Sequence, residues 1–158
     1  MGCMKRICIP IGFSLVELLV VIALISIVSA ISVPMWQRYA AKTDLKTAAR
    51  EVMAELSNAK QRAVEENLDV YRLTFNVAGN SYVLSRTDTG TVWTRSVASF
   101  GNGISIDSGN PPNFSGGSTV SFKKRGTLSP GSVTLRNGLG STATITVNIT
   151  GRTYVQFN

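Results

Sequence analysis

Residues 18–37 carry no charged side chain, and this stretch constrains the fold more than any other feature of the chain. It reads LLVVIALISIVSAISVPMWQ, 20 consecutive positions between Glu17 and Arg38. At ~1.5 Å per residue a helix of that length covers ~30 Å, the hydrocarbon thickness of a bilayer. A buried core helix is the alternative, but the run is apolar on every face and a 158-residue chain is too small to wrap it. We therefore expect residues 18–37 to span a membrane once.

The flanks of this run distinguish a membrane span from a cleaved secretory signal. A signal peptide has an apolar region of ~7–15 residues followed by a small-residue cleavage site. This run is longer, and its end at Trp36 and Gln37 leads directly into Arg38. The basic pair Lys5 and Arg6 precedes it, so the positive-inside rule places the N-terminus in the cytoplasm. The rest of the chain is then expected in the periplasm, outside a bacterial inner membrane.

Two residues are unusual for a plain anchor. Glu17 stands at the start of the run, and a carboxylate costs a few kcal/mol at mid-bilayer depth but less near the interface. Either it reaches the headgroups, or it pairs with a cation supplied by another chain. Pro34 removes a backbone hydrogen bond and clashes with the carbonyl four residues back, which predicts a kink or a locally melted turn near residues 30–34.

The start of the chain resembles the N-terminal signature of type IV pilins and pseudopilins. Residues 12–18 read GFSLVEL, with Gly12, the aromatic Phe13 and, four positions later, Glu17. The resemblance implies that a prepilin peptidase cleaves after Gly12 on the cytoplasmic side and that Phe13 is then N-methylated. It also implies that Glu17 neutralises the Phe13 amine of a neighbouring subunit during assembly. Pro34 falls where such pilins commonly carry a helix-disrupting proline.

The charge chemistry agrees with the implied pairing. An α-amino group has a pKa near ~8 and is largely charged at neutral pH, and burying it together with a carboxylate offsets the cost of burying each alone. The implied leader is residues 1–12, with translation starting at Met1 or Met4. Both cysteines, Cys3 and Cys8, lie in this leader, so the processed chain rests on its core without disulfides.

An amphipathic helix is predicted to continue after the apolar run. Apolar residues recur at spacings of three and four, which makes one stripe that we expect to cover a sheet. The helix is expected to start near Phe13 and to end near Asn67. The stripe consists of Leu45, Ala49, Val52, Leu56, Ala59 and Ala63. The expected segments are the leader 1–12, the membrane and assembly helix 13–37, its amphipathic continuation 38–67 and a globular domain 68–158.

From Asp69 onward the apolar period changes to two, as in β-strands. Residues 70–75 and 81–86 flank a turn at Gly79-Asn80 and predict a hairpin, and residues 108–117 (SGNPPNFSGG) predict a loop. Further strands are expected at 91–97, 103–107, 118–122, 132–136, 142–149 and 152–157. The predicted fold is α+β, a long N-terminal helix packed on an antiparallel β-sheet domain, which is the pilin fold that the resemblance implies.

The C-terminal order of turns and strands is similar to the GspH/FimT branch of minor pilins. A strand leads into the turn at Lys123-Lys124-Arg125-Gly126, and a second strand follows Gly131. A third strand ends in Asn148, and the last opens with Gly151-Arg152. This pattern is the one feature that favours a minor over a major subunit.

The composition disfavours an enzyme. The chain has no His, and its only acids after residue 70 are Asp88 and Asp107. Paired carboxylates, a metal-ligand cluster or an activated nucleophile cannot be assembled from that set. We expect no catalytic residue, no cofactor and no metal.

The basic excess indicates an alternative partner. Lys and Arg number 16 against 9 Asp and Glu, and residues 108–158 hold five cations and no acid. Basic patches attract nucleic-acid phosphates, and some FimT-type minor pilins bind DNA near a C-terminal Gly-Arg motif. Tyr154 stands here where a second basic residue would strengthen that case, so the cations are either a solvated surface or a DNA contact. The candidate DNA-binding residues are Lys123, Lys124, Arg125 and Arg152.

Two functions follow. The first is a minor pilin or pseudopilin that assembles into, or primes at the tip of, a type IV pilus or a type II secretion pseudopilus. Its partners would be prepilin peptidase, other pilin or pseudopilin subunits and the inner membrane. The alternative is a minor pilin that binds DNA for uptake. The sequence leaves the parent machine, and minor against major status, open.

Overall fold

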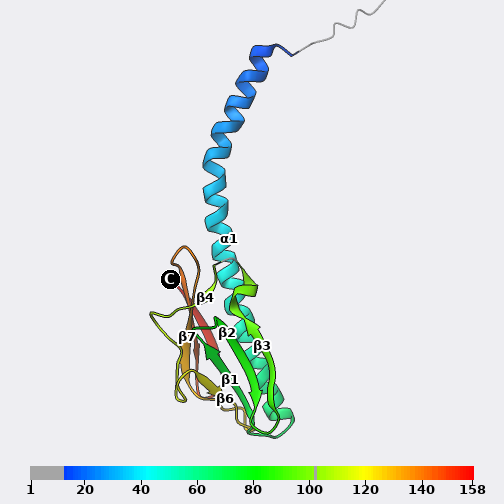
Figure 1. Cartoon of the computed structure of the whole chain (residues 1–158), viewed down its shortest axis with the longest axis vertical. Coiled ribbons are helices and arrows are strands. Elements are labelled where there is room, and N and C mark those ends of the chain that lie inside the picture. The colour runs from blue at the N-terminus through cyan, green and yellow to red at the C-terminus, as the bar shows by residue number, and fades with distance from the viewer. Residues whose placement is uncertain (1–12, 102) are drawn as a thin grey trace, which may run out of the picture. The chain divides into compact units, whose positions relative to one another are not determined.

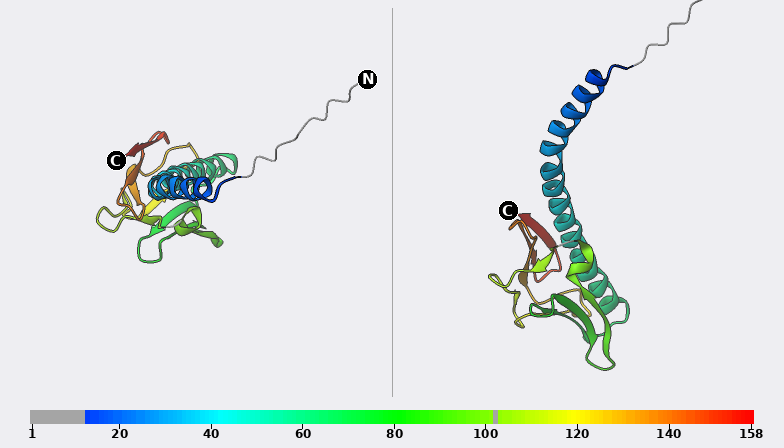
Figure 2. Two further views of the ribbon diagram at one scale, coloured as in Figure 1. Left: turned by 90° about the horizontal axis from the view of Figure 1, so that it is seen from above. Right: turned by 45° about the horizontal axis from the view of Figure 1, so that its top comes forward.

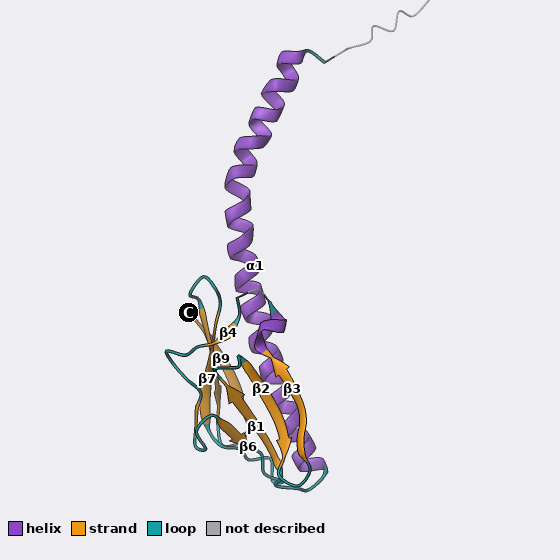
Figure 3. Cartoon of the chain, in the orientation of Figure 1, coloured by secondary structure: helices purple, strands orange, loops and turns teal. Residues whose placement is uncertain are grey.

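The computed structural model describes residues 13–101 and 103–158. Its dominant element is the helix α1, Leu15–Glu65, an unbroken run of 51 residues (Figure 1). The chain divides into two compact units, the first ending at Gln37 and the second beginning at Arg38. The first holds the apolar part of α1. The second holds the rest of α1 and all the strands (Figure 3).

A hydrogen-bonded cap ends α1 at Asn67. The Asn67 backbone has φ 53°, its N–H donates to the Val64 carbonyl (3.1 Å), and the Leu68 N–H donates to the Ala63 carbonyl (3.1 Å). A left-handed residue with this pair of bonds is a Schellman motif, in which Asn is the usual substitute for Gly. The last helical residue is therefore Glu65, two positions before the end expected from the sequence.

The apolar stripe of α1 is confirmed at every predicted position. All of these side chains are at most 3% exposed, and Ala48, which the pattern omitted, is buried with them. Four of the seven buried positions are alanine, and these small side chains let the strands approach the helix backbone closely.

The turn predicted to melt near Pro34 is helical, so that prediction is wrong. Residues 30–34 lie inside α1, and the Ser32 hydroxyl donates to the Val28 carbonyl at 2.8 Å. Pro34 removes the usual donor of the Ala30 carbonyl, but a single missing bond does not unwind a helix whose neighbouring turns are intact. A kink without melting stays a prediction.

The strands form two antiparallel sheets beside the C-terminal part of α1 (Figure 2). One has the order β3-β2-β1-β6, and the other has the order β4-β7-β8-β9 with β5 paired to β7. The first sheet contains β1 (Tyr71–Asn76), β2 (Ser81–Arg86), β3 (Gly90–Ser96) and β6 (Thr119–Ser121). The second contains β4 (Ser105–Ile106), β5 (Asn113–Phe114), β7 (Gly131–Arg136), β8 (Thr142–Val147) and β9 (Thr153–Phe157). A short 3₁₀ helix, η1 (Val97–Phe100), follows β3.

The predicted hairpin is confirmed as β1 and β2, and every other predicted strand overlaps an observed one. The domain has two sheets rather than one, because a period of two marks a strand but does not encode its partner. The predicted loop 108–117 contains β5, whose residues Asn113 and Phe114 pair with β7. Two paired residues are too few to produce an alternating pattern, so the loop prediction is wrong at these positions.

Asn80 joins the two sheets through the turn of the first hairpin. Its backbone is left-handed at φ 45°, its side-chain amide donates to the Ile104 carbonyl at 3.0 Å, and its amide oxygen accepts the Ile106 N–H at 2.8 Å. One turn residue therefore fixes β4 of the second sheet to the end of the first.

Candidate functional site

The residues of the predicted assembly signature lie at the exposed start of α1. Phe13 precedes the helix and is 82% exposed. Glu17 is exposed in the first helical turn, where its carboxylate complements the positive end of the helix dipole. None of the three salt bridges within residues 13–101 and 103–158 uses Glu17. Gly12, the predicted cleavage position, lies outside the described residues.

The first unit presents apolar side chains on all sides. α1 is long and apolar enough to cross a membrane, with a mean hydropathy of 2.7 in its most apolar window and none of that window buried. The hydroxyls of Ser26 and Ser32 donate back to the carbonyls of Ile22 (2.7 Å) and Val28 (2.8 Å). These two polar groups are thus satisfied within the helix, and Glu17 is the only charged residue in 13–37.

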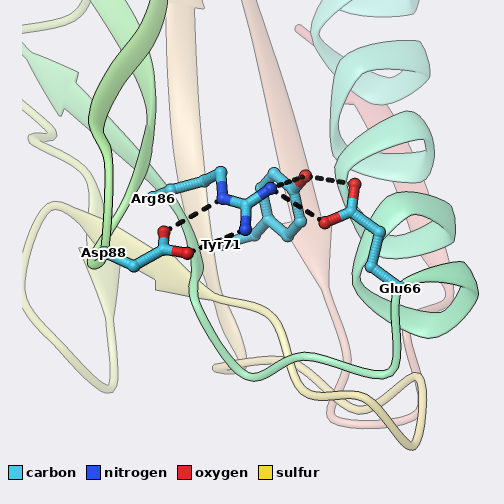
Figure 4. A network of polar contacts seen from close by, with 4 residues as sticks. All are labelled: Glu66, Tyr71, Arg86 and Asp88. Atoms are coloured by element: carbon cyan, nitrogen blue, oxygen red, sulfur yellow. Dashed lines mark hydrogen bonds and ion pairs between the residues drawn. The ribbon is translucent and has the colours of Figure 1, made fainter.

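A four-residue network that sequence reasoning missed joins the end of α1 to the first hairpin (Figure 4). Arg86, the last residue of β2, pairs with Glu66 at 3.0 Å and with Asp88 at 2.8 Å. The Tyr71 hydroxyl donates to Glu66 at 2.6 Å and accepts from Arg86 at 3.3 Å. The Arg86 guanidinium also lies 5.3 Å from the centroid of the Tyr71 ring. These groups are 2 to 22 positions apart in sequence, and no helix or strand pattern brings the four together.

The charges of the network fix its protonation state. Hydrogen bonding from Arg86 lowers the pKa of Asp88 to about 2, and the same bond is the main cause that raises the pKa of Arg86. Burial, followed by the hydrogen bond to Glu66, raises the pKa of Tyr71 above its ordinary value. At neutral pH the network therefore holds a guanidinium, an Asp88 carboxylate and a neutral phenol.

A second contact between α1 and the first sheet lies one strand further out. Arg95 of β3 pairs with Glu55 at 2.8 Å, and the Glu55 side chain is only 13% exposed. The Arg95 guanidinium lies 5.5 Å from the Trp93 ring centroid, and Trp93 meets Tyr82 edge to face at 5.6 Å. The buried Tyr82 hydroxyl lies near the Arg95 guanidinium but forms no hydrogen bond of good geometry among the described residues, and burial raises its pKa to about 12.

The candidate DNA-binding cations lie on exposed turns that meet at Lys60 of α1. Lys123-Lys124-Arg125 occupies a turn closed by a bond from the Gly126 N–H to the Lys123 carbonyl (2.8 Å). Arg152 follows a turn that is closed at Gly151. The carbonyl of Thr150, the residue before Gly151, accepts a hydrogen bond from the Lys60 ammonium (3.3 Å). A Cβ added at Gly126 or at Gly151 would meet the Lys60 side chain at 3.3 or 2.5 Å. We call these five cations, Lys60, Lys123, Lys124, Arg125 and Arg152, the C-terminal basic surface.

One acid interrupts the C-terminal basic surface. The Asp69 carboxylate accepts the backbone N–H of Lys124 at 2.6 Å, and it shares a shallow hollow with the side chains of this turn. Lys60 was not identified from the sequence, because on the helix it reads as one more polar residue that flanks the stripe.

Within the described residues no group of three or more His, Cys, Asp or Glu side chains lies together as a metal site would require. The expected absence of a metal, a cofactor and a catalytic residue stays a prediction.

Comparisons with known proteins agree with this geometry. A family model described as "Prokaryotic N-terminal methylation motif" matches residues 12–33. The fold is similar to the structure of the minor pseudopilin EpsH from the Type 2 Secretion System of Vibrio cholerae, with a TM-score of 0.54 and 12% sequence identity over 72% of this chain and 96% of that one. A methylation motif at the head of a long apolar helix, followed by antiparallel sheets packed on that helix, defines a type IV pilin-like protein.

The particular family follows from a second model. "Type II transport protein GspH" matches residues 48–151, more than half of the chain, and the protein belongs to this family of minor pilins and pseudopilins. Two proteins of Pseudomonas aeruginosa, each described as "Fimbrial protein", are 41% identical over 59 residues, which is 37% of this chain and 38% of theirs. The chain thus matches well under half the length of these curated relatives.

We predict opposite outcomes when the two buried tyrosines of the first sheet are changed to phenylalanine. Tyr71→Phe removes a hydrogen bond to a carboxylate and should lower the free energy of unfolding by about 1–2 kcal/mol. Tyr82→Phe removes a buried hydroxyl without a partner and should change it by less than ~0.5 kcal/mol or increase it. Urea unfolding of the chain from residue 38 onward measures both, and equal losses would contradict the assigned contacts.

The Arg86 network should also make stability depend on pH in the acid range. The folded pKa of Asp88, about 2, lies below the ordinary ~3.9 of an unfolded Asp. The carboxylate therefore stabilises the fold above about pH 4, and this contribution disappears as the pH falls through about 2. Asp88→Asn should lower Tm at pH 7, with a deficit that shrinks from pH ~4 to ~2. Asp107→Asn, which removes an acid outside the network, is the control. A deficit that stays constant with pH would refute the linkage.

Proposed function

We propose that this minor pilin or pseudopilin is cleaved after Gly12, N-methylated at Phe13, and assembled into a filament through Glu17. The observation that carries the proposal is the state of Glu17, an exposed carboxylate with no salt bridge among the described residues. It stands at the head of a helix that is otherwise uncharged as far as Gln37. Cleavage would create the missing cation, because it converts Phe13 into a free α-amine.

The pairing is proposed to act between chains, so it would set the stagger of neighbouring subunits. A charge left alone in hydrocarbon costs a few kcal/mol, and an amine and a carboxylate together offset much of this cost. Only one axial offset between two helices brings one chain's Phe13 amine to the next chain's Glu17. Packing of apolar side chains alone would tolerate several offsets.

Before assembly, the apolar segment 13–37 would hold the protein in the inner membrane, with residues 38–67 and 68–158 in the periplasm. The charges on the two sides of the segment do not decide this orientation. Lys5 and Arg6 precede it, but Arg38, Lys42 and Lys46 follow it closely. The orientation is supported instead by the methylation motif at residues 12–33, since a prepilin peptidase acting on the cytoplasmic side would need Gly12 there.

The filament itself is proposed as either a type II secretion pseudopilus or a type IV pilus, with the protein incorporated in it or priming it at the tip. The GspH family supports the first, and the fimbrial relatives support the second over the 59 residues they share with the chain.

Replacing Glu17 tests the assembly role. Glu17→Ala should leave insertion into the inner membrane intact but strongly reduce the fraction of the protein found in sheared filaments, because the neighbouring amine loses its counter-charge. Glu17→Asp keeps the charge and should restore part of the incorporation. Immunoblots of membrane and filament fractions measure both quantities, and wild-type incorporation of Glu17→Ala would contradict the pairing.

A second candidate function is DNA capture by the C-terminal basic surface. The observation that favours it is the position of Lys60, which lies against both turns and adds a fifth cation to the four identified from the sequence. Five cations on one surface would attract phosphates in a strongly salt-dependent way, although Asp69 reduces the local positive charge.

The salt dependence of DNA binding tests this candidate. The chain from residue 38 onward should bind duplex DNA at low salt, with an affinity that falls steeply as salt is added. Joint replacement of Lys123, Lys124, Arg125 and Arg152 by Ala should abolish binding. Replacing four exposed cations elsewhere, Arg38, Arg50, Arg62 and Arg136, is the control for net charge. Equal losses in the two variants, or no binding at low salt, would remove DNA as a partner.

A further inference from the structure

A second set of cations lies on α1 directly after its apolar segment, and the functions above do not use it. Arg38, Lys42, Lys46 and Arg50 recur every four residues and are all exposed. Side chains four apart lie near one another on a helix, so these cations form one stripe. The only acid among residues 38–50 is Asp44. It lies about 200° around the helix from Lys42 and from Lys46, where it packs against Gly101.

Two cations of the stripe border a groove of about 290 Å³ in the second unit. The α1 wall consists of Lys42, Leu45 and Lys46, and the opposite wall includes Ser141, Thr142 and Phe157. Leu45 is buried at the base, whereas Phe157 is 46% exposed at the end of β9. Neither lysine takes part in any of the salt bridges within residues 13–101 and 103–158. The groove, which Asn158 also lines, therefore combines two ammonium groups that form no salt bridge among the described residues, two hydroxyls and an apolar surface.

A buried asparagine holds the wall opposite α1 in place. Asn137 is 2% exposed, and its side-chain amide donates to the Ala41 carbonyl of α1 at 3.2 Å. Its amide oxygen accepts the Ser141 N–H at 2.9 Å. The next residue, Thr142, exchanges two backbone bonds of 2.9 Å with Asn158. The groove is therefore preformed, because both walls are fixed by bonds that involve no bound molecule.

We propose that this groove binds the phosphate of an anionic phospholipid headgroup, an inference that rests on the proposed membrane segment. Lys42 follows Gln37 by five residues, or ~7.5 Å of helix, and the headgroup region extends roughly 5–7 Å beyond the hydrocarbon on each side. The Lys42 backbone is thus at the outer edge of the headgroup region, and that of Lys46, nine residues or ~13.5 Å after Gln37 along α1, lies beyond it. Their long side chains would extend back towards the lipid phosphates. Trp36 and Tyr39, aromatic residues of the kind enriched at membrane interfaces, mark the boundary just before it.

The chemistry of the groove matches a headgroup in both charge and polarity. A phosphate diester accepts hydrogen bonds from two ammonium groups and two hydroxyls, and the glycerol with the start of an acyl chain fits the exposed face of Phe157. Clustered cations beside a membrane segment attract anionic lipids. An acidic surface of a neighbouring subunit is the competing occupant. The lysines of the groove follow the last residue of the apolar segment by only five and nine positions, which favours the lipid.

Native mass spectrometry of the full processed chain in detergent micelles tests the proposal. With phosphatidylglycerol and phosphatidylcholine added in equal amounts, the chain should retain phosphatidylglycerol. The double variant Lys42→Gln/Lys46→Gln should retain it no better than phosphatidylcholine. Lys123→Gln/Lys124→Gln removes the same charge from another surface and should retain it like the wild type. Lys42→Arg/Lys46→Arg keeps the charge and should retain it too, which guards against loss through misfolding.

Three outcomes would overturn the lipid assignment. Equal retention of the two lipids by the wild type, or equal loss in the Lys42/Lys46 and Lys123/Lys124 variants, would show that the groove does not select the headgroup. Displacement of the lipid by inorganic phosphate at modest concentration would indicate a site for free anions. Normal lipid retention by Lys42→Gln/Lys46→Gln, together with loss of filament incorporation, would make the groove a subunit contact.

The proposed membrane and assembly roles fail separately from this one. Release of the wild-type chain from membranes by alkaline carbonate would contradict the membrane segment itself. Glu17→Ala lacks the proposed assembly contact but keeps the groove, so it should retain phosphatidylglycerol at the wild-type level.

Discussion

The helix α1 has to satisfy two kinds of surroundings along one unbroken ladder of backbone hydrogen bonds, and the rest of the structure follows from this constraint. From Leu18 to Gln37 its side chains are uncharged in every direction, with Ser26 and Ser32 bonded back to the helix itself. From Arg38 onward charges return, and only one stripe stays buried. A domain attached to such a helix has to cover that stripe and leave the other faces in water, which the two antiparallel sheets do.

The alanines of the stripe create a second requirement. Small side chains let the strands come close, but they project too little from the helix to prevent it from sliding along its axis. Polar contacts at three places along α1 fix the position of the helix along its axis within the second unit. Asn137 binds the Ala41 carbonyl near one end, Arg95 pairs with Glu55 in the middle, and Tyr71 with Arg86 holds Glu66 at the other end. The apolar stripe supplies the burial, and these contacts supply the register.

Sequence patterns predicted the features that depend on local periodicity. Spacings of two to four residues predicted three of these features: the stripe from Leu45 to Ala63, the hairpin of β1 and β2, and the helix end near Asn67. The two-sheet arrangement, the pairing of β5 and the Arg86 network depend on residues brought together from distant positions, and no local spacing encodes them. At Pro34 a local rule predicted a kink or a melted turn, and the intact turns on either side exclude only the melted turn. At the candidate site, the sequence predicted that Glu17 reaches the headgroups or pairs with a cation of another chain, and this stays a prediction. The cations from Arg38 to Arg50 have the spacing expected for the polar side of any amphipathic helix. Their spacing alone therefore does not indicate a binding site.

Under the two proposals, the apolar segment has the Glu17 carboxylate at one end and the Lys42 and Lys46 ammonium groups after the other. The relative strengths of the carboxylate–amine pair and of the lysine–lipid contacts decide which interaction controls assembly. Cations near a membrane surface each contribute about 1 kcal/mol, in a high-dielectric region where water replaces a lost headgroup at little cost. Glu17 and a partner amine would meet in or beside hydrocarbon, where the same Coulomb attraction is several times stronger because the effective dielectric constant is lower. A groove that binds lipid would therefore hold the domain at the membrane without preventing its departure. The carboxylate at the other end would favour the filament, because no solvent molecule in the bilayer can substitute for the amine.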